Sequence, residues 1–246
     1  MNIVEPAVQL LAHTAIVSGA IEQRLEIQEG STDAETLTVY AGRSCYESWS
    51  RPNEKTRRDE DYLRRTLFEQ GHFSILEHAS ATFYLTGVSR ALTHELVRHR
   101  HLSYSQLSQR FVDEKDANIV LPPAIRDSSI EVLDFDKDLE PHMLPADMYL
   151  ADAMDDAGFQ YRSLVDALAN SGLTRKQARE AARAVLPNMT ETRIVVTGNM
   201  RAWHEVITRR TAPDADAEFQ QVAGLIRDEL KKIAPAIFTD QKEPND

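Results

Sequence analysis

The chain has 246 residues, a formal charge of −11, one cysteine and 42% hydrophobic residues. These values are typical of a globular protein, and we expect one domain over residues 1–246. The acidic balance argues against a protein that binds nucleic acid through bulk charge. A single cysteine excludes an internal disulfide and a multi-cysteine metal site. The N-terminus has no signal-peptide pattern and no apolar run approaches about 18 residues, so we expect a cytoplasmic protein without membrane contact.

Hydrophobic spacing divides the first hundred residues into short elements. Alternating apolar residues predict strands, and apolar residues three or four apart predict helices. Ser31 and Asp33 are the N-cap candidates of the first helix, and Gly71 is a typical terminator of the second. The expected elements are strands at 7–14, 21–27 and 81–85 and helices at 32–46, 59–70 and 88–98.

The second half of the chain has fewer and longer elements. Residues 113–145 are acidic and contain prolines without a clean period, so we expect a long excursion over the site or at a subunit boundary. Thr174 and Gln177 form a capping box, and Pro187 stops the helix that they open. The other expected elements are strands at 109–113 and 190–197, a turn at Gly198, helices at 148–170, 199–210 and 214–233, and a frayed tail at 243–246. Strands interspersed with helices indicate an α/β or α+β class.

The segment from Arg90 to Arg110 is a positive island, with four arginines and one acid, Glu95. In its first half, basic residues recur every four positions and share one helix face. Leu92 and Leu96 fall on the opposite face, which we expect to be buried. Such a helix would deliver arginines to the loop that follows it.

The loop RHRHLSYSQLSQR is rich in hydroxyl and amide side chains. Ser103, Ser105 and Ser108 alternate with Gln106 and Gln109, a pattern that favours local backbone hydrogen bonds over a regular helix. Guanidinium groups, hydroxyls and free backbone N–H groups together predict a site for a phosphate-bearing ligand. The alternative is a solvated basic face held by surface ion pairs.

Three other patterns have simpler explanations. His94 and Glu95 begin a zinc motif, but the next histidine, His99, comes one residue late, and i and i+5 do not share a helix face, so we expect no metal. Cys45 lies beside apolar positions, where a small core residue is the alternative to a nucleophile. Arg183 and Arg210 each lie at the C-terminal end of a predicted helix. At that position a cation also interacts favourably with the helix dipole, which is the alternative to a role in binding.

Five sequence blocks together resemble flavin-dependent thymidylate synthase. Arg98-His99-Arg100, then seven residues, then Ser108, looks like the RHR-x7-S signature of that family, and the run SYSQLSQR resembles its actinobacterial form. The remaining blocks occur in the family's order: His72-x-Ser74-x-x-Glu77-His78, Ala-Arg183-Ala-Val-Leu-Pro, Thr-Gly-Asn199-Met-Arg201 and Ile-Thr-Arg209-Arg210. The resemblance extends over residues 70–212, most of the chain.

The resemblance implies a fold, a reaction and a set of site residues. The fold would be a central mixed sheet flanked by helices, in a homotetramer with active sites shared between subunits. The reaction would be the methylation of dUMP to dTMP, with FAD as cofactor and NADPH and methylenetetrahydrofolate as co-substrates. The FAD contacts would be Ser74, Arg98, His99, Arg100, Gln106, Asn199, Met200, Arg201 and Glu205, with His204 as the alternative to Glu205. The dUMP contacts would be Glu95, Leu96, Val97, Arg98, Gln106, Leu107, Ser108, Gln109, Arg110, Arg183 and Arg210, with Arg90 as an addition.

The residues themselves are consistent with this chemistry. Methylation at C5 of uracil requires activation at C6, and Cys45 has no activating neighbours for a thiolate mechanism. A permanently charged arginine can stabilise the negative charge that develops on a pyrimidine, and by resemblance this catalytic residue is Arg210. The sequence also allows two other hypotheses: a nucleotide- or RNA-binding module without catalysis, and a histidine-rich metal hydrolase.

Overall fold

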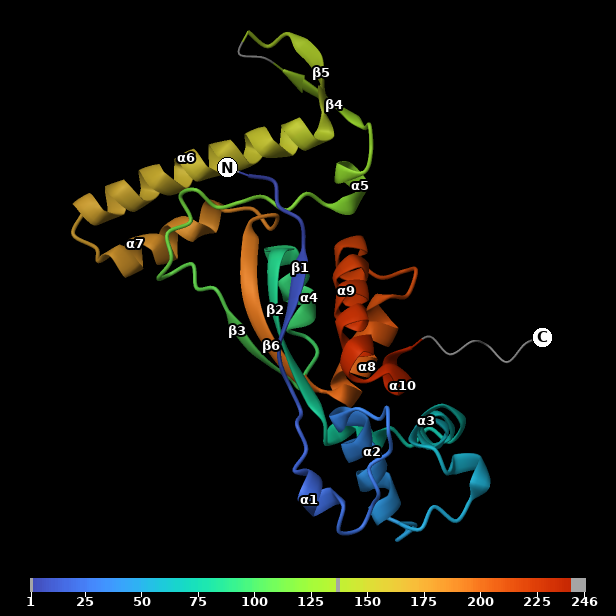
Figure 1. Cartoon of the computed structure of the whole chain (residues 1–246). Helices are drawn as coiled ribbons and strands as arrows, with labels where there is room; N and C mark the ends of the chain where they lie inside the picture. The colour runs from blue at the N-terminus through green and yellow to red at the C-terminus, as the bar shows by residue number, and fades with distance from the viewer. Residues whose placement is uncertain (1, 136–137, 240–246) are drawn as a thin grey trace.

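The computed structural model describes residues 2–135 and 138–239 and contains a four-stranded sheet at its centre (Figure 1). The strand order is β1-β2-β6-β3, and each pairing of neighbours is antiparallel. The predicted mixture of strands and helices is confirmed, whereas the predicted mixed sheet is wrong. The strands are β1 Ala7–His13, β2 Ser80–Ser89, β3 Leu102–Gln106 and β6 Glu191–Asn199.

The position of β6 explains this difference. Strands β2 and β3 run in the same direction and are joined through helix α4 (Arg90–Leu96), as in a parallel crossover. Strand β6 is inserted between them and is antiparallel to both. The local pattern of residues 80–106 does not predict that a strand beginning at residue 191 lies between β2 and β3, because pairing between distant segments depends on tertiary packing.

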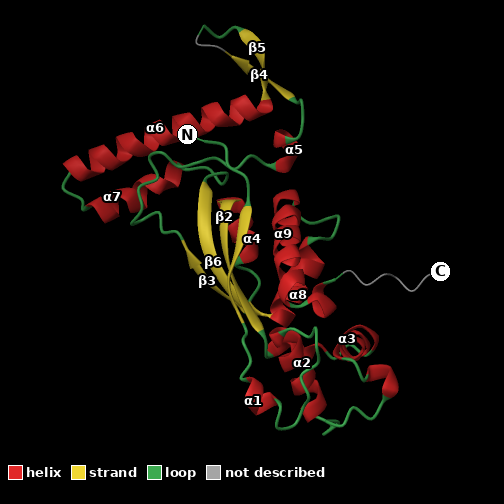
Figure 2. Cartoon of the chain, viewed as in Figure 1, coloured by secondary structure: helices red, strands yellow, loops and turns green. Residues whose placement is uncertain are grey.

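Helices cover one face of the sheet (Figure 2). Residues along β2 alternate between buried and half-buried, which is the pattern of a strand with one face against a core. The sheet's helical neighbours include α4, α8 (Met200–Arg210) and α9 (Ala217–Ile233), which contact β2, β6 and β1 respectively. Beyond the lower end of the sheet in Figure 1 lie α1 Ser18–Ile21, α2 Asp33–Ser44 and α3 Asp59–Arg64, and α10 Pro235–Phe238 packs against α9 and α3. Short turns of helix occur at Glu54–Thr56, Arg65–Glu69 and Phe73–Glu77.

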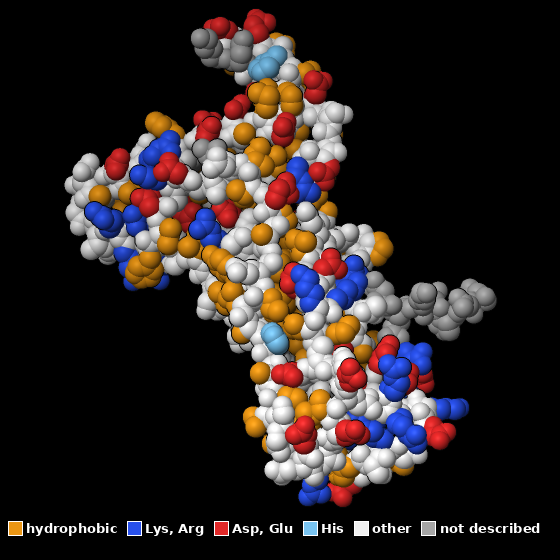
Figure 3. Space-filling model, viewed as in Figure 1, with side chains coloured by type: hydrophobic (Ala, Val, Ile, Leu, Met, Phe, Trp, Pro, Cys, Tyr) orange, Lys and Arg blue, Asp and Glu red, His pale blue; other side chains and the backbone are white. Residues whose placement is uncertain are grey.

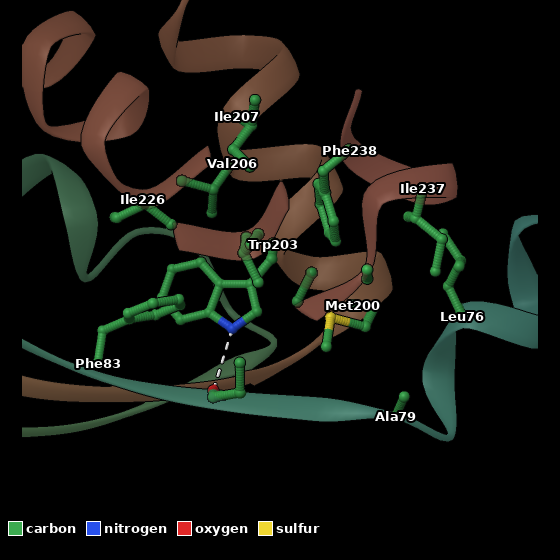
Figure 4. Packing of buried hydrophobic residues seen from close by; sticks show 14 of the residues in the cluster. Leu76, Ala79, Phe83, Met200, Trp203, Val206, Ile207, Ile226, Ile237 and Phe238 are labelled. Carbon is green, nitrogen blue, oxygen red and sulfur yellow. Dashed lines mark hydrogen bonds between the residues drawn. The ribbon is translucent and has the colours of Figure 1, made fainter. Parts of the chain in front are cut away.

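Trp203 anchors α8 to the sheet (Figure 4). Its side chain is fully buried, its indole N–H donates to the carbonyl of Ala81 at 3.1 Å, and Phe83 packs edge-on at 5.1 Å between ring centroids. Gly198 continues β6 and is not the predicted turn. A Cβ at that position would lie 2.2 Å from the side chain of Leu102, so the glycine allows β3 and Trp203 to approach the strand closely.

A separate arm projects from the sheet and is built from the segment predicted as an irregular excursion. It contains a two-stranded hairpin, β4 (Glu131–Phe135) and β5 (Pro141–Pro145), that leads into the long helix α6 (Ala146–Asn170), as Figure 1 shows. The short helix α5 (Pro123–Arg126) precedes the hairpin. Helix α7 (Arg175–Ala182) folds back against α6 and is followed by a single turn of helix at Arg183–Val185.

Several local predictions are confirmed by backbone geometry. Thr174 and Gln177 form the expected capping box, and the predicted terminator Gly71 has a positive φ of +71°. Gly172, which follows α6, has a φ of +95°. Within the described residues, no helix combines the length and hydropathy of a membrane span.

Three further local predictions are wrong. The expected strand at 21–27 is the end of α1 followed by turns, and 109–113 is a turn rather than a strand. The N-cap of α2 is Thr32, not Ser31 or Asp33 as predicted. The hydroxyl of Thr32 accepts the backbone N–H of Glu35, and the carboxylate of Glu35 accepts the backbone N–H of Thr32. The tail predicted to fray lies outside the described residues.

Candidate active site

A pocket of about 580 Å³ opens between the turn that follows α4 and helix α8. Arginines outnumber glutamates in its lining by four to two, in a chain whose total charge is −11. The pocket therefore attracts an anion. Its lining residues are Glu95, Arg98, His99, Arg100, His101, Leu102, Ala202, Glu205, Arg209 and Arg210, and six of these were predicted as site residues.

Helix α4 and Tyr104 shape the turn at the floor of this pocket. Leu92 and Leu96 are buried as predicted, but the helix ends at Leu96 and not at Arg98. The hydroxyl of Tyr104 lies 2.7 Å from the carbonyl oxygens of both Leu96 and His99 and shares its one proton between them, and the N–H of His99 also donates to Leu96 at 3.1 Å. These bonds use carbonyls that a longer helix would have bonded internally. Burial raises the pKa of Tyr104 to about 12, so the hydroxyl remains a donor at neutral pH.

The turn separates the three residues of the Arg98-His99-Arg100 triplet. Arg98 and Arg100 are exposed and line the pocket, whereas His99 is half-buried and faces Arg210. A continued helix would have spread these side chains over three directions around its axis. The early end of α4 places both arginines at the mouth of one pocket.

Arg210, the last residue of α8, meets groups from three other parts of the chain. Its Nε donates to Nε2 of His99 at 3.1 Å, and its Nη1 forms a short ion pair with the carboxylate of Glu95. Its guanidinium carbon lies 4.7 Å from the ring centroid of Phe219, which is fully buried in α9. The guanidinium is thus fixed on three sides while a fifth of the side chain remains exposed.

His99 is neutral in this arrangement. Its Nε2 accepts the hydrogen bond from Arg210, which assigns the ring proton to Nδ1. Burial lowers the pKa of His99, and the adjacent charge of Arg210 lowers it further. Because a guanidinium occupies the accepting nitrogen of His99, this histidine is engaged with Arg210 and not poised as a metal ligand.

Three of the predicted flavin residues, Asn199, Met200 and Arg201, lie where β6 meets α8. Asn199 is the N-cap of α8, and its side-chain oxygen accepts the N–H of Ala202 at 2.9 Å. Arg201 is exposed and pairs with Glu77, on the same short helical turn as the exposed Ser74. Met200 points into the core and is fully buried, so only its backbone is available to a ligand.

Glu205 and His204 have different surroundings. Glu205 is exposed, lines the pocket and pairs with Arg209 at 3.0 Å. His204 packs against Phe73, with ring centroids 5.0 Å apart, in an adjoining hollow of about 230 Å³ that also includes Glu205 and Arg209. Burial lowers the pKa of His204, which favours its neutral ring.

A second group of predicted residues lies beyond the other end of β3, beside α7. The carbonyl of Leu107 accepts from Arg90 at 3.0 Å, and Arg110 pairs with Glu180 of α7 at 2.7 Å. Arg183 is the exposed C-cap of α7. Burial lowers the pKa of Arg90; the charge of Glu114 opposes this shift and that of Arg183 adds to it.

One chain therefore does not bring all of the predicted residues together. Strand β3 separates the pocket, at its Leu102 end, from the cluster beyond Gln106 (Figure 1). Gln106 itself lies between the two groups, where its amide nitrogen contacts the hydroxyls of Thr93 and Thr192 at 3.1 and 3.3 Å.

Two sequence expectations about these segments are corrected. Residues predicted as a polar loop include strand β3, because Leu102 and Tyr104 turn inward while Ser103 and Ser105 face outward, a period of two that is visible in the sequence. Cys45 is exposed at the end of α2 rather than packed in the core.

Two residues of the site carry no obvious signal in the sequence. Tyr104 lies inside a serine-rich run, where an aromatic residue can be a buried anchor. Phe219 belongs to the buried stripe of α9, where its spacing is that of any core residue.

The fold and the pocket together define a protein with a cationic site for a small anionic ligand, centred on a guanidinium that the chain holds in place. The chain belongs to the family described as Thymidylate synthase complementing protein, which matches residues 27–236. This confirms the resemblance found in the sequence.

Relatives that carry the name flavin-dependent thymidylate synthase align over most of the chain. The protein from Mycobacteroides abscessus is 48% identical over 97% of this chain and 91% of its own length. The protein from Mycobacterium tuberculosis H37Rv is 50% identical over 85% of this chain and 82% of its own length. The protein from Mycolicibacterium gilvum is 48% identical over 86% of this chain and 82% of its own length.

Proposed function

We propose that this protein is an enzyme that methylates dUMP reductively to dTMP, with methylenetetrahydrofolate as carbon donor and NADPH as reductant through FAD. Family membership and the name shared by its relatives support the reaction. The observation that carries the proposal is that Arg98, His99 and Arg100 meet Arg210, from a helix a hundred residues later, around one cationic pocket.

The residues present fit FAD, which carries a pyrophosphate and flat ring systems. Exposed Arg98 and Arg100 provide forked donors for phosphate oxygens. The adjoining hollow with Phe73 and His204 provides aromatic surface, and Glu205 lies between the two spaces. The residues that would hold FAD are those named from the resemblance, with Met200 acting through its backbone. When bound, FAD would supply the hydride that the reaction requires.

Arg210 acts on the pyrimidine in this proposal. Its charge is permanent, so it can stabilise negative charge on the uracil ring without exchanging a proton. Nε is engaged by His99 and Nη1 by Glu95, which leaves Nη2 to face the substrate. Because residues of the chain itself hold the guanidinium, little reorganisation is needed at the moment of reaction.

The nucleotide phosphate is assigned to the second group of residues. Leu107 to Arg110, Arg183 and Arg90 lie together beyond β3 and present guanidinium and backbone donors. They lie apart from Arg210 in one chain, so we propose that each active site combines this cluster from one subunit with the pocket of another.

A homotetramer with shared sites is therefore part of the proposal. Figure 3 shows hydrophobic side chains on the surface of the hairpin and of the arm below it. Such patches are typical of association surfaces. Large exposed hydrophobic residues of this region are Ile130, Leu133, Phe135, Met143, Met148 and Phe159. The exposed free thiol of Cys45 fits the reducing cytoplasm that we propose as its compartment.

Tritium release from 5-labelled dUMP tests the reaction directly. The purified protein should bind FAD with a flavin absorbance spectrum and release tritium only with NADPH and methylenetetrahydrofolate present. Protein that binds neither FAD nor dUMP would refute the proposal.

Co-expression of two inactive variants tests the shared sites. Arg183→Ala and Arg210→Ala should each be inactive alone, but mixed oligomers should regain activity because some sites then combine two intact halves. If sites lay within one chain, mixing would restore nothing. Sedimentation of the same samples would show whether the oligomer is a tetramer.

A further inference from the structure

The buried face of the Arg210 guanidinium packs against helix α9, which lies outside the five sequence blocks that resemble the family. Glu95 and His99 belong to the signature segment, but Phe219 lies in the first turn of α9, after the last matching block. Phe219 is fully buried, and its ring faces the guanidinium at 4.7 Å from the centroid. The same ring meets His99 edge-on, with centroids 6.1 Å apart and planes at 80°.

The guanidinium of Arg210 forms a cation–π contact with the face of the Phe219 ring, and His99 is a second partner of the same ring. The negative face of the ring attracts the guanidinium, and the ring excludes water from that side of Arg210. Phe219 therefore opposes two movements of Arg210, toward the core and away from the His99 bond. The contact also compensates part of the cost of placing a guanidinium with only 21% of its side chain exposed.

Glu218, the residue before Phe219, fixes the ring relative to α4. Its two carboxylate oxygens accept the backbone N–H of Ser89 at 2.7 Å and the hydroxyl of Ser89 at 2.6 Å, and both residues are buried. The same hydroxyl caps α4 by accepting the N–H of Leu92 at 3.0 Å. Helix α4 carries Glu95, so adjacent residues of α9 hold both sides of the Glu95–Arg210 pair.

We propose that Phe219 is a positioning residue for Arg210, holding its guanidinium through the face of the ring, and that the Glu218–Ser89 contact sets where that ring lies. The proposal rests on the role assigned to Arg210 in the proposed function. It assigns part of the reactivity of this site to a side chain that touches neither substrate nor cofactor.

Graded fluorination of the Phe219 ring tests this inference without emptying the core. Site-specific incorporation of mono-, di- and trifluorophenylalanine weakens the negative ring face stepwise while the shape changes little. The turnover number for dUMP should fall with each fluorine, by about 2- to 30-fold in total, the span of a cation–π contact. The same series at Phe83, a fully buried ring that packs on Trp203, is the matched control and should leave turnover nearly constant.

A second readout does not depend on activity. The fluorine resonance of 4-fluoro-Phe219 should shift when Arg210→Gln removes the charge, and that of 4-fluoro-Phe83 should not. A flat turnover series in an active enzyme, or a Phe219 resonance indifferent to Arg210→Gln, would overturn the inference alone. Wild-type protein without any dUMP turnover would instead overturn the proposed function.

Discussion

Replacement of Arg210 by alanine is the most direct test of how this site works. The change removes a guanidinium that bonds His99 and Glu95 and faces Phe219. Loss of one preorganised donor at a developing negative charge typically lowers turnover by about 10²–10³-fold, or about 3–4 kcal/mol of transition-state stabilisation. We expect a loss of that size in the turnover number.

The folded protein should survive the substitution. Glu95 is 39% exposed on its side chain and can be rehydrated when its partner is removed, so the stability cost should be about 1–2 kcal/mol. FAD should remain bound, because Arg98 and Arg100 are untouched. Arg210→Lys should recover only part of the turnover, since an ammonium cannot reproduce the forked contacts to His99 and Glu95.

Tritium release under saturating cofactors measures the loss, and flavin absorbance and thermal unfolding monitor binding and fold. Arg64→Ala is a matched control, because it removes an exposed arginine that pairs with Asp61 and does not line the pocket. Near-normal turnover in Arg210→Ala, with Arg64→Ala also normal, would refute the electrostatic role of Arg210.

Three further outcomes follow from the structure. Burial lowers the pKa of His99 below its ordinary value, so the ring stays neutral through the pH at which a free histidine titrates. Turnover should fall only as the pH drops through this lowered pKa, because protonated His99 loses its acceptor for Arg210. The stability contributed by His99 is present above the ordinary pKa of a histidine and is lost as the pH falls through the lowered one. His99→Gln, which keeps an acceptor but does not titrate, should flatten that acid limb, and a limb that persists would contradict the assignment. Cys45→Ser should change the turnover number little and the free energy of unfolding by less than about 0.5 kcal/mol, because the thiol is exposed and makes one weak contact. A defect in the chemical step of this variant would instead support a thiolate mechanism. Gly87→Ala should lower the free energy of unfolding by about 2 kcal/mol or more, measured by denaturant titration. The reason is that φ at Gly87 is +62° and the new Cβ would lie 1.9 Å from the carbonyl oxygen of Glu5. An unchanged unfolding midpoint would show that the backbone near β1 and β2 relaxes freely around the new side chain.

Local rules of the sequence were sufficient for most helices and for the outline of the site. The capping box at Thr174, the positive-φ glycine after residue 70 and the buried leucines of α4 depend on neighbours within one or two turns. The clustering of arginines at residues 98–110 also required no tertiary information, because guanidinium chemistry is the same in any fold.

Long-range packing decided what the sequence left open. Whether β2 and β3 would pair directly depended on β6, which arrives a hundred residues later and separates them. Where α4 stops depended on the hydroxyl of Tyr104, bonded to carbonyls that any longer helix would have used itself. The first outcome has no local signature, because β6 is distant in the chain. The second depends on Tyr104, only eight residues after Leu96, whose strand is held in place by pairing with the distant β6.

The same division holds for Arg210. Sequence alone named it as the catalytic candidate, through a resemblance that covers most of the chain. Only the tertiary structure showed Glu95, His99 and Phe219 around its guanidinium and placed Arg183 with a different group of cations beyond β3. A residue's charge is a property of its side chain, whereas its direction and its neighbours depend on how the whole chain folds.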